Sequence, residues 1–279
     1  MADQLKFEIL TIGNELLIGK ILNTNAQWLS RRITSLGGRV TRIITIGDDV
    51  NEISTTIRDC LSRKPDFIIT VGGLGPTFDD KTLEGVAYAV NVKLEVNEEA
   101  LKMVKMKYES LGRARGEKIE LTPPRIKMAT LPRSAKPLRN PVGTAPGVLL
   151  EADGVTIICL PGVPEEMKAI FEDSISPIIR GRSKLVFCEK SLRLEGIYES
   201  DLAPIIDQVL KMNPKVYIKS HPKREEGGAY IELHFSTSDE SLDKCLRLIE
   251  LSASEIKRHV VERGGKVTEI SAEENVSLQ

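Results

Sequence analysis

The sequence predicts an α/β protein: a doubly wound, mostly parallel sheet in three α/β/α layers, followed by a second, smaller α+β domain. Short β-branched segments alternate with amphipathic segments from the start of the chain, as in parallel sheets covered by helices on both faces. Beyond 178–184 this pattern ends, and AYIELHFST alternates between apolar and polar residues, which indicates a sheet with one solvated face. We therefore expect an α/β domain over 1–178, a small domain over 183–265 and a flexible tail over 266–279.

The elements of the first domain follow in strand–helix order. Continuous apolar runs such as KFEILTI and DFIITV are typical of buried parallel strands, and each is followed by a segment with helical periodicity. The segment 94–118 is highly charged and predicts one or two helices ending in a basic loop, whereas the proline-rich segment 121–148 predicts irregular structure. The expected strands are 6–12, 39–46, 66–71 and 155–160, with helices near 25–36, 51–63, 81–90 and 164–174.

The composition narrows the possible classes of protein. The chain has 279 residues and a formal net charge of -1, which gives no general argument for nucleic acid or a membrane surface as partner. No apolar run reaches the roughly 18 residues that a membrane-spanning helix needs. The four cysteines are far apart and form no CxxC motif, so we expect them to be reduced, in a cytoplasmic protein without a signal peptide.

The stretch TVGGLGPTFDDKT, residues 70–82, lies between an apolar strand and a helix. Glycines in such a turn let backbone N–H groups approach an anion, although GGLG is neither a dinucleotide fingerprint nor a P-loop. The alternative is a tight strand-to-helix turn without a ligand. The residues expected to contact phosphate or nucleotide here are Gly72, Gly73, Leu74, Gly75, Pro76 and Thr77.

Two adjacent carboxylates, Asp79 and Asp80, end this loop. One of them could cap the following helix, but a cap needs only one residue. Two carboxylates beside a phosphate would repel it, and a divalent ion such as Mg²⁺, Mn²⁺ or Co²⁺ removes the conflict by bridging carboxylate and phosphate oxygens. Asp48, after the second strand, is a third candidate metal ligand; Asp48 and Asp49 could both join the same edge of the sheet, or Asp49 could simply cap the helix near 51–63.

Other polar loops follow the predicted strands. In a parallel sheet these loops lie along one edge, so their side chains are expected to converge on a ligand. Glu15 is a candidate general base, named for its position after the first strand. No zinc-binding spacing and no GxSxG motif occurs. The further candidates for ligand contact are Asn14, Asn25, Asn140, Gly143, Thr144, Pro161 and Gly162.

Four of these loops carry a family resemblance: GNELLIGKILNTN, GGLGPTFDDKT, NPVGTAPG and LPGVPEEMKAIF. Together they resemble the molybdopterin-binding (MoCF) domain as it occurs in CinA-type competence-damage proteins, over residues 5–175. In the wider family, which includes molybdopterin adenylyltransferases and molybdotransferases, a GGTG-like loop and a following aspartate bind pterin phosphate or nucleotide. The resemblance implies that role for Gly72, Gly73, Gly75 and Asp80, whereas Leu74 stands where those enzymes usually have threonine.

The resemblance implies three functions. The CinA branch is associated with metal-dependent ADP-ribose pyrophosphatase activity, which is our leading hypothesis, with Asp79 and Asp80 holding the metal. The first alternative is molybdopterin adenylyl transfer or molybdenum insertion, with molybdopterin as the ligand, and Leu74 speaks against it. The second is a nucleotide- or pterin-binding protein without catalysis, which we expect to be homo-oligomeric.

The second domain resembles the KH-type segment that follows the MoCF domain in CinA. The expected strands are 185–194, 215–220 and 229–237, with helices over 199–211 and 240–263. A KH module that binds nucleic acid has a GxxG loop between helices, and none occurs in 183–265. We therefore expect dimerisation or covering of the site rather than nucleic-acid binding. The resemblance also places a deamidase domain after this module in full-length CinA, and we expect no room for one before residue 279.

Overall fold

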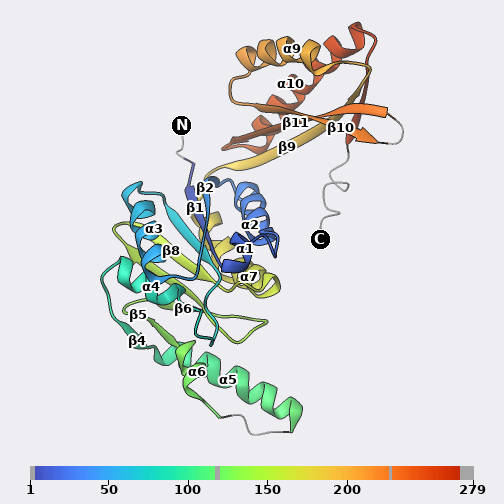
Figure 1. Cartoon of the computed structure of the whole chain (residues 1–279). Coiled ribbons are helices and arrows are strands. Elements are labelled where there is room, and N and C mark those ends of the chain that lie inside the picture. The colour runs from blue at the N-terminus through green and yellow to red at the C-terminus, as the bar shows by residue number, and fades with distance from the viewer. Residues whose placement is uncertain (1–3, 117–119, 226–227, 271–279) are drawn as a thin grey trace. The chain divides into compact units, whose positions relative to one another are not determined.

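The computed structural model describes residues 4–116, 120–225 and 228–270, which form two compact units that divide between Ser183 and Lys184 (Figure 1). The first unit is a sheet with helices on both faces, and the second is an antiparallel sheet with two helices. Within the described ranges, no helix is long and apolar enough to cross a membrane.

The sheet of the first unit has six strands in the order β2-β1-β3-β8-β7-β6. The first four are parallel, which confirms the predicted mostly parallel sheet, and β7 runs antiparallel to both of its neighbours. Strand β7 was not predicted, because its short sequence GVLLEA follows a proline-rich segment. The strands are β1 (Lys6–Ile12), β2 (Arg39–Ile46), β3 (Phe67–Val71), β6 (Lys136–Leu138), β7 (Gly147–Ala152) and β8 (Val155–Leu160).

Helices cover both faces of this sheet (Figure 1). One face packs against α3 (Val50–Ser62), α4 (Thr82–Ala89) and part of α5 (Glu98–Arg115). The other packs against α2 (Thr24–Ser35) and against a longer helical segment that continues beyond the predicted end at 174. That segment consists of α7 (Pro164–Ile170), the π-helical turn η1 (Phe171–Ile175) and α8 (Ser176–Arg182).

Alternating side chains of β1 enter the two hydrophobic cores. Phe7 and Ile9 face α2 and α7, and the Phe7 ring stacks on Phe67 with centroids 4.6 Å apart. Leu10 and Ile12 face α3 and α4. The strand is therefore apolar on both faces, which explains its unbroken hydrophobic sequence.

The helix expected within 94–118 is confirmed as α5, whereas 121–148 contains short helices and strands, so the prediction of irregular structure there is wrong. Helix α5 extends through Arg115 and takes up much of the expected basic loop, whose last residues, 117 and 118, lie outside the described ranges. Arg125 stacks over the ring of Tyr108, 4.2 Å from its centroid, and so holds the next helix against α5. Three other elements of the segment 94–148 are too short for sequence periodicity to predict them: β4 (Leu94–Val96), β5 (Thr130–Pro132) and α6 (Pro123–Lys127).

The second unit is a four-stranded antiparallel sheet in the order β10-β11-β9-β12, with two helices. Residues of β11 alternate between buried and partly exposed, as predicted. The tail expected from residue 266 begins instead with a strand, because β12 pairs with β9, and residues 271–279 lie outside the described ranges. The elements are β9 (Val186–Glu195), α9 (Glu199–Met212), β10 (Tyr217–Glu225), β11 (Gly228–Asp239), α10 (Leu242–Glu262) and β12 (Lys266–Ile270).

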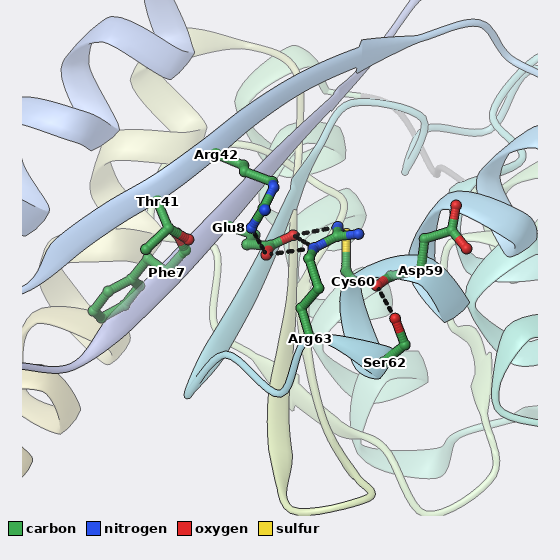
Figure 2. A network of polar contacts seen from close by, with 8 residues as sticks. All are labelled: Phe7, Glu8, Thr41, Arg42, Asp59, Cys60, Ser62 and Arg63. Atoms are coloured by element: carbon green, nitrogen blue, oxygen red, sulfur yellow. Dashed lines mark hydrogen bonds and ion pairs between the residues drawn. The ribbon is translucent and has the colours of Figure 1, made fainter.

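A carboxylate is buried near the start of β1. Glu8 is 2 % exposed, and the guanidinium groups of Arg63 and Arg42 both reach it (Figure 2). Burial alone raises the pKa of Glu8, but hydrogen bonds with Arg63 and Cys60 and the two guanidinium charges outweigh burial and lower it. Because Glu8 lies at the end of the strand opposite the polar loops, this network serves the fold.

Candidate functional site

The loops that follow β1, β3 and β8 meet at the carboxyl edge of the sheet. The Gly72 N–H donates to the Leu160 carbonyl over 3.0 Å, and a β-carbon added at Gly72 would overlap the carbonyl of Ile12. The Asn25 amide donates to the Gly162 carbonyl over 2.7 Å, so the start of α2 also joins this edge. Pro161 precedes Gly162 in the same loop, at the end of β8. The structure thus brings together candidates that are far apart in sequence.

The glycine loop has a backbone that other residues would strain. Gly72 has a φ of 108° and Gly73 a φ of 66°. The buried hydroxyl of Thr82 donates to the Gly72 carbonyl over 2.7 Å, and the Thr82 N–H donates to the Gly73 carbonyl over 3.2 Å. A β-carbon at Gly73 would overlap that hydroxyl. Sequence reasoning missed Thr82, although its place in the first turn after the loop was a usable signal.

Neither aspartate of the loop caps α4, because Lys81 holds the cap position and makes no side-chain cap bond. Both instead face Thr77. Its hydroxyl contacts the Asp79 carboxylate and lies 2.6 Å from Asp80 Oδ2, and its N–H donates to the same Asp80 oxygen over 2.8 Å. One hydroxyl proton can serve only one carboxylate at a time. Hydrogen bonding by Thr77 lowers the pKa of Asp79, with a smaller contribution from the charge of Lys127.

The other acidic candidates lie in the loops after β1 and β2. Asp48 accepts a hydrogen bond from the Asn14 N–H over 2.9 Å, and the Glu15 carboxylate covers Gly13. Asp49 is the cap of α3 and accepts from two N–H groups of its first turn. Among the residues that the structure describes, no three carboxylate, His or Cys side chains form a group that could hold a metal. Asp48 is therefore not assembled with Asp79 and Asp80.

The candidate ligand-contact residues in NPVGTAPG make contacts that stabilise their own loop. The Asn140 amide donates to the Glu166 carboxylate over 2.7 Å, and its oxygen accepts from the Gly143 N–H over 2.7 Å. A β-carbon at Gly143 would overlap the Glu166 carboxyl group, so a larger residue there would displace the Glu166 side chain. Thr144 contacts the sulfur of Met128 at 3.8 Å. Glu166 of α7 thus has a partner that the sequence did not reveal.

A pocket of ≈ 380 Å³ lies between the glycine loop and α6. Leu74 is 4 % exposed and belongs to the hydrophobic core, whereas Pro76 and Thr77 are exposed and do not line the pocket. Lys127, which the sequence did not single out, contacts the Thr77 carbonyl with its ammonium group. The residues that line the pocket are Gly73, Leu74, Gly75, Asp80, Leu83, Glu84, Leu94, Pro123, Ile126, Lys127 and Thr130.

Comparisons with known proteins show to which family this chain belongs. Residues 8–181 match the family described as "Probable molybdopterin binding domain", which is more than half of the chain. The chain therefore belongs to this family. The matched residues contain the six-stranded sheet except for the first two residues of β1, together with the glycine loop and the pocket.

The chain also resembles particular proteins, over different shares of its length. A protein of Pyrobaculum arsenaticum is 45% identical over 92% of this chain and 95% of its own length. A protein of Caldivirga maquilingensis is 48% identical over 84% of this chain and 88% of its own. The crystal structure of the protein CinA with unknown function from Thermoplasma acidophilum is 42% identical, with a TM-score of 0.56, and covers 62% of this chain and 98% of that one. The first domain is thus CinA-like.

Proposed function

We propose that the first unit binds a phosphorylated pterin of the molybdopterin type, with the phosphate at the glycine loop and the ring system in the adjoining pocket. The family description supports the pterin. The pocket supports the two-part ligand, because its lining includes both the glycine loop and the apolar residues Leu83, Leu94 and Ile126. Its volume of ≈ 380 Å³ lies at the lower end of the range for small-molecule sites.

The observation that carries the proposal is the set of free donors in the glycine loop. Within the described ranges, no hydrogen bond is found for the N–H groups of Gly73, Leu74 and Gly75, whereas those of Gly72 and Thr77 are paired. Consecutive unpaired N–H groups in a loop with a positive φ attract anions. The glycines also keep side chains away from the approaching phosphate.

Anaerobic ultrafiltration with molybdopterin tests this proposal, with the retained pterin measured by fluorescence after oxidation. We expect about one pterin retained per chain. ATP is then added to test whether the bound molybdopterin is also adenylylated, which would make the protein an enzyme. An adenylylated pterin would appear in that case. Protein that retains no molybdopterin at concentrations well above those of the chain contradicts the proposal.

A second function, metal-dependent hydrolysis of a nucleotide pyrophosphate such as ADP-ribose, is favoured by one observation. The carboxylates of Asp79 and Asp80 both face Thr77, and a divalent ion in phosphate chemistry commonly takes one or two carboxylates together with phosphate oxygens. These two residues therefore fit such an ion and would hold it. When bound, the ion polarises a phosphoryl oxygen. Glu15 is kept as the proposed general base.

This second function is tested by AMP release from ADP-ribose with Mg²⁺, Mn²⁺ or Co²⁺. We expect Asp80→Asn to lose most of the activity, because it removes a charged ligand. An inactive wild type with all three ions, or full activity in Asp80→Asn, excludes this mechanism while leaving pterin binding unaffected.

A further inference from the structure

Lys127 brings a positive charge to the glycine loop from a segment 50 residues away in sequence. Its ammonium group donates to the carbonyl of Thr77. Among the residues that line the pocket, Lys127 is the single Lys or Arg, whereas Asp80 and Glu84 are acidic. A phosphate that enters the pocket therefore meets this one cation.

The residues on either side of Lys127 fix its position in the fold. Met128 and Ala129, directly after α6, are 2 % and 0 % exposed and belong to the core. Arg125 stacks over the Tyr108 ring and attaches α6 to α5. The lysine thus extends from an anchored segment, and its flexible side chain can exchange one partner for another.

We propose that Lys127 binds the phosphate of the ligand together with the free N–H groups of the glycine loop, and that it leaves the Thr77 carbonyl to do so. This inference rests on the proposed function, because it takes the phosphate to lie at the same loop. It assigns the ligand class as a phosphate ester whose ring system occupies the apolar part of the pocket.

Charge balance supports this role. A phosphate carries up to two negative charges, and the carboxylates of Asp79 and Asp80 lie in the same loop. An ammonium group has three N–H donors, and the one that the Thr77 carbonyl uses becomes available when Lys127 leaves that carbonyl. Lys127 can therefore contact phosphate oxygens and offset part of the repulsion, with or without a metal ion.

The test compares three variants of the full chain: Lys127→Met, Lys127→Arg and Lys81→Met. Lys81 is the matched control, because its charge also acts on Asp79 although it does not line the pocket. The probes are molybdopterin and the same pterin after phosphatase treatment. We expect Lys127→Met to weaken molybdopterin binding by roughly 10–100-fold, the effect of losing a charged hydrogen bond. Binding of the dephosphorylated pterin is expected to change less than about twofold.

Lys127→Arg keeps the charge and is expected to restore part of the affinity, and Lys81→Met is expected to bind as the wild type does. If Lys127→Met lost affinity for both pterins equally and had a lowered Tm, Lys127 would have a structural role and the proposal would be overturned. Unchanged binding of molybdopterin in Lys127→Met would also overturn the proposal. If the wild type binds neither pterin, the proposed function fails. Calorimetry with inorganic pyrophosphate then tests Lys127 separately. If the wild type binds pyrophosphate and Lys127→Met does not, Lys127 is supported as the phosphate ligand. If the wild type does not bind pyrophosphate, that role of Lys127 is refuted.

Discussion

Arg63 holds the buried carboxylate of Glu8 with two guanidinium nitrogens: Nε lies 2.9 Å from Oε1, and Nη2 lies 2.6 Å from Oε2 (Figure 2). The Glu8 side chain is 2 % exposed and that of Arg63 is 30 % exposed. The pair therefore joins β1 to the end of α3 at the edge of a hydrophobic core. Such a geometry makes the loss of one partner costly, because the carboxylate would stay buried without its counter-charge.

Arg63→Met is expected to lower the free energy of unfolding of the first unit by about 2–3 kcal/mol at pH 7, less than for a fully buried pair because Arg63 is partly solvated. Urea unfolding followed by the fluorescence of Trp28 measures this. Trp28 is the one tryptophan of the chain, and it packs against Phe171 in the first unit. Arg42→Met is the control: its side chain is 51 % exposed, so we expect a loss below about 1 kcal/mol. Equal effects of the two variants would contradict this account.

The same network predicts a dependence of stability on pH. The pKa of Glu8 is lowered in the folded protein. A lowered pKa stabilises the fold above the pKa of the unfolded chain, about 4.3, and this contribution is lost as the pH falls through the folded pKa. Glu8→Gln is therefore expected to be less stable than the wild type at pH 7, and the difference is expected to narrow below about pH 4.3. Urea titrations at several pH values test it, and a constant difference down to about pH 2 would rule out this linkage.

Gly73→Ala is expected to destabilise the first unit and to abolish pterin retention. The left-handed φ costs about 1–2 kcal/mol for alanine, and overlap with the Thr82 hydroxyl raises the total to about 2–4 kcal/mol. Gly154→Ala is the matched control, because Gly154 has a φ of 79° but no atom within 4 Å of an added β-carbon. That control is expected to lose about 1 kcal/mol and to keep its ligand. The two variants are compared by urea unfolding and anaerobic ultrafiltration, and pterin retention by Gly73→Ala would contradict the site.

The parts of the fold that the sequence predicted are those with a local physical signature. Strands buried on both faces read as unbroken apolar runs, and Asp49 was correctly offered as a helix cap because capping depends on neighbouring residues. Strand β12 was missed because its partner, β9, lies far earlier in the chain, and the sequence of β12 does not specify that partner. Strand β7 pairs with β8 across the tight turn at Asp153 and Gly154, a local signal that the sequence prediction did not use.

For the site, a tight turn at Gly72 and Gly73 could be predicted from residue type, because both have the positive φ angles that favour glycine. The orientation of Asp79 and Asp80 towards Thr77 depends on the path of the loop, which residue types do not determine. Lys127 could not be foreseen either, because its contact with Thr77 spans a segment in which the sequence predicted no regular structure. Polar contacts between residues far apart in the sequence leave no periodic pattern, so they cannot be predicted from the sequence alone.

Thr82→Val is expected to loosen the glycine loop while keeping the shape of the side chain. It removes the hydrogen bond to the Gly72 carbonyl, and the buried oxygen loses its partner, at a cost of about 1–2 kcal/mol. Thr82→Ser keeps the hydroxyl and serves as control. Urea unfolding gives the stability, and ultrafiltration gives the affinity for molybdopterin, which we expect to fall in the valine variant alone. Equal affinities in the two variants would show that Thr82 does not position the loop.

Cys159 lies on β8, one residue before Leu160, and the Leu160 carbonyl accepts the hydrogen bond from the Gly72 N–H. The reactivity of the Cys159 thiol therefore reports on opening of the carboxyl edge of the sheet, where the candidate site lies. Burial raises the pKa of Cys159 to about 12. At pH 8 about one thiol in 10,000 is then ionised, against about a quarter for an exposed cysteine of pKa near 8.5. We therefore expect a disulfide reagent to label Cys159 only when the protein opens, and molybdopterin to slow that labelling further, because ligand binding lowers the open population. Peptide mass spectrometry after timed labelling follows this cysteine separately, with Cys245 of the second unit as internal control. Rapid labelling of Cys159 in the native protein would show that this edge of the sheet opens readily. If the ligand slowed the labelling of both Cys159 and Cys245, its effect would not be local to the site.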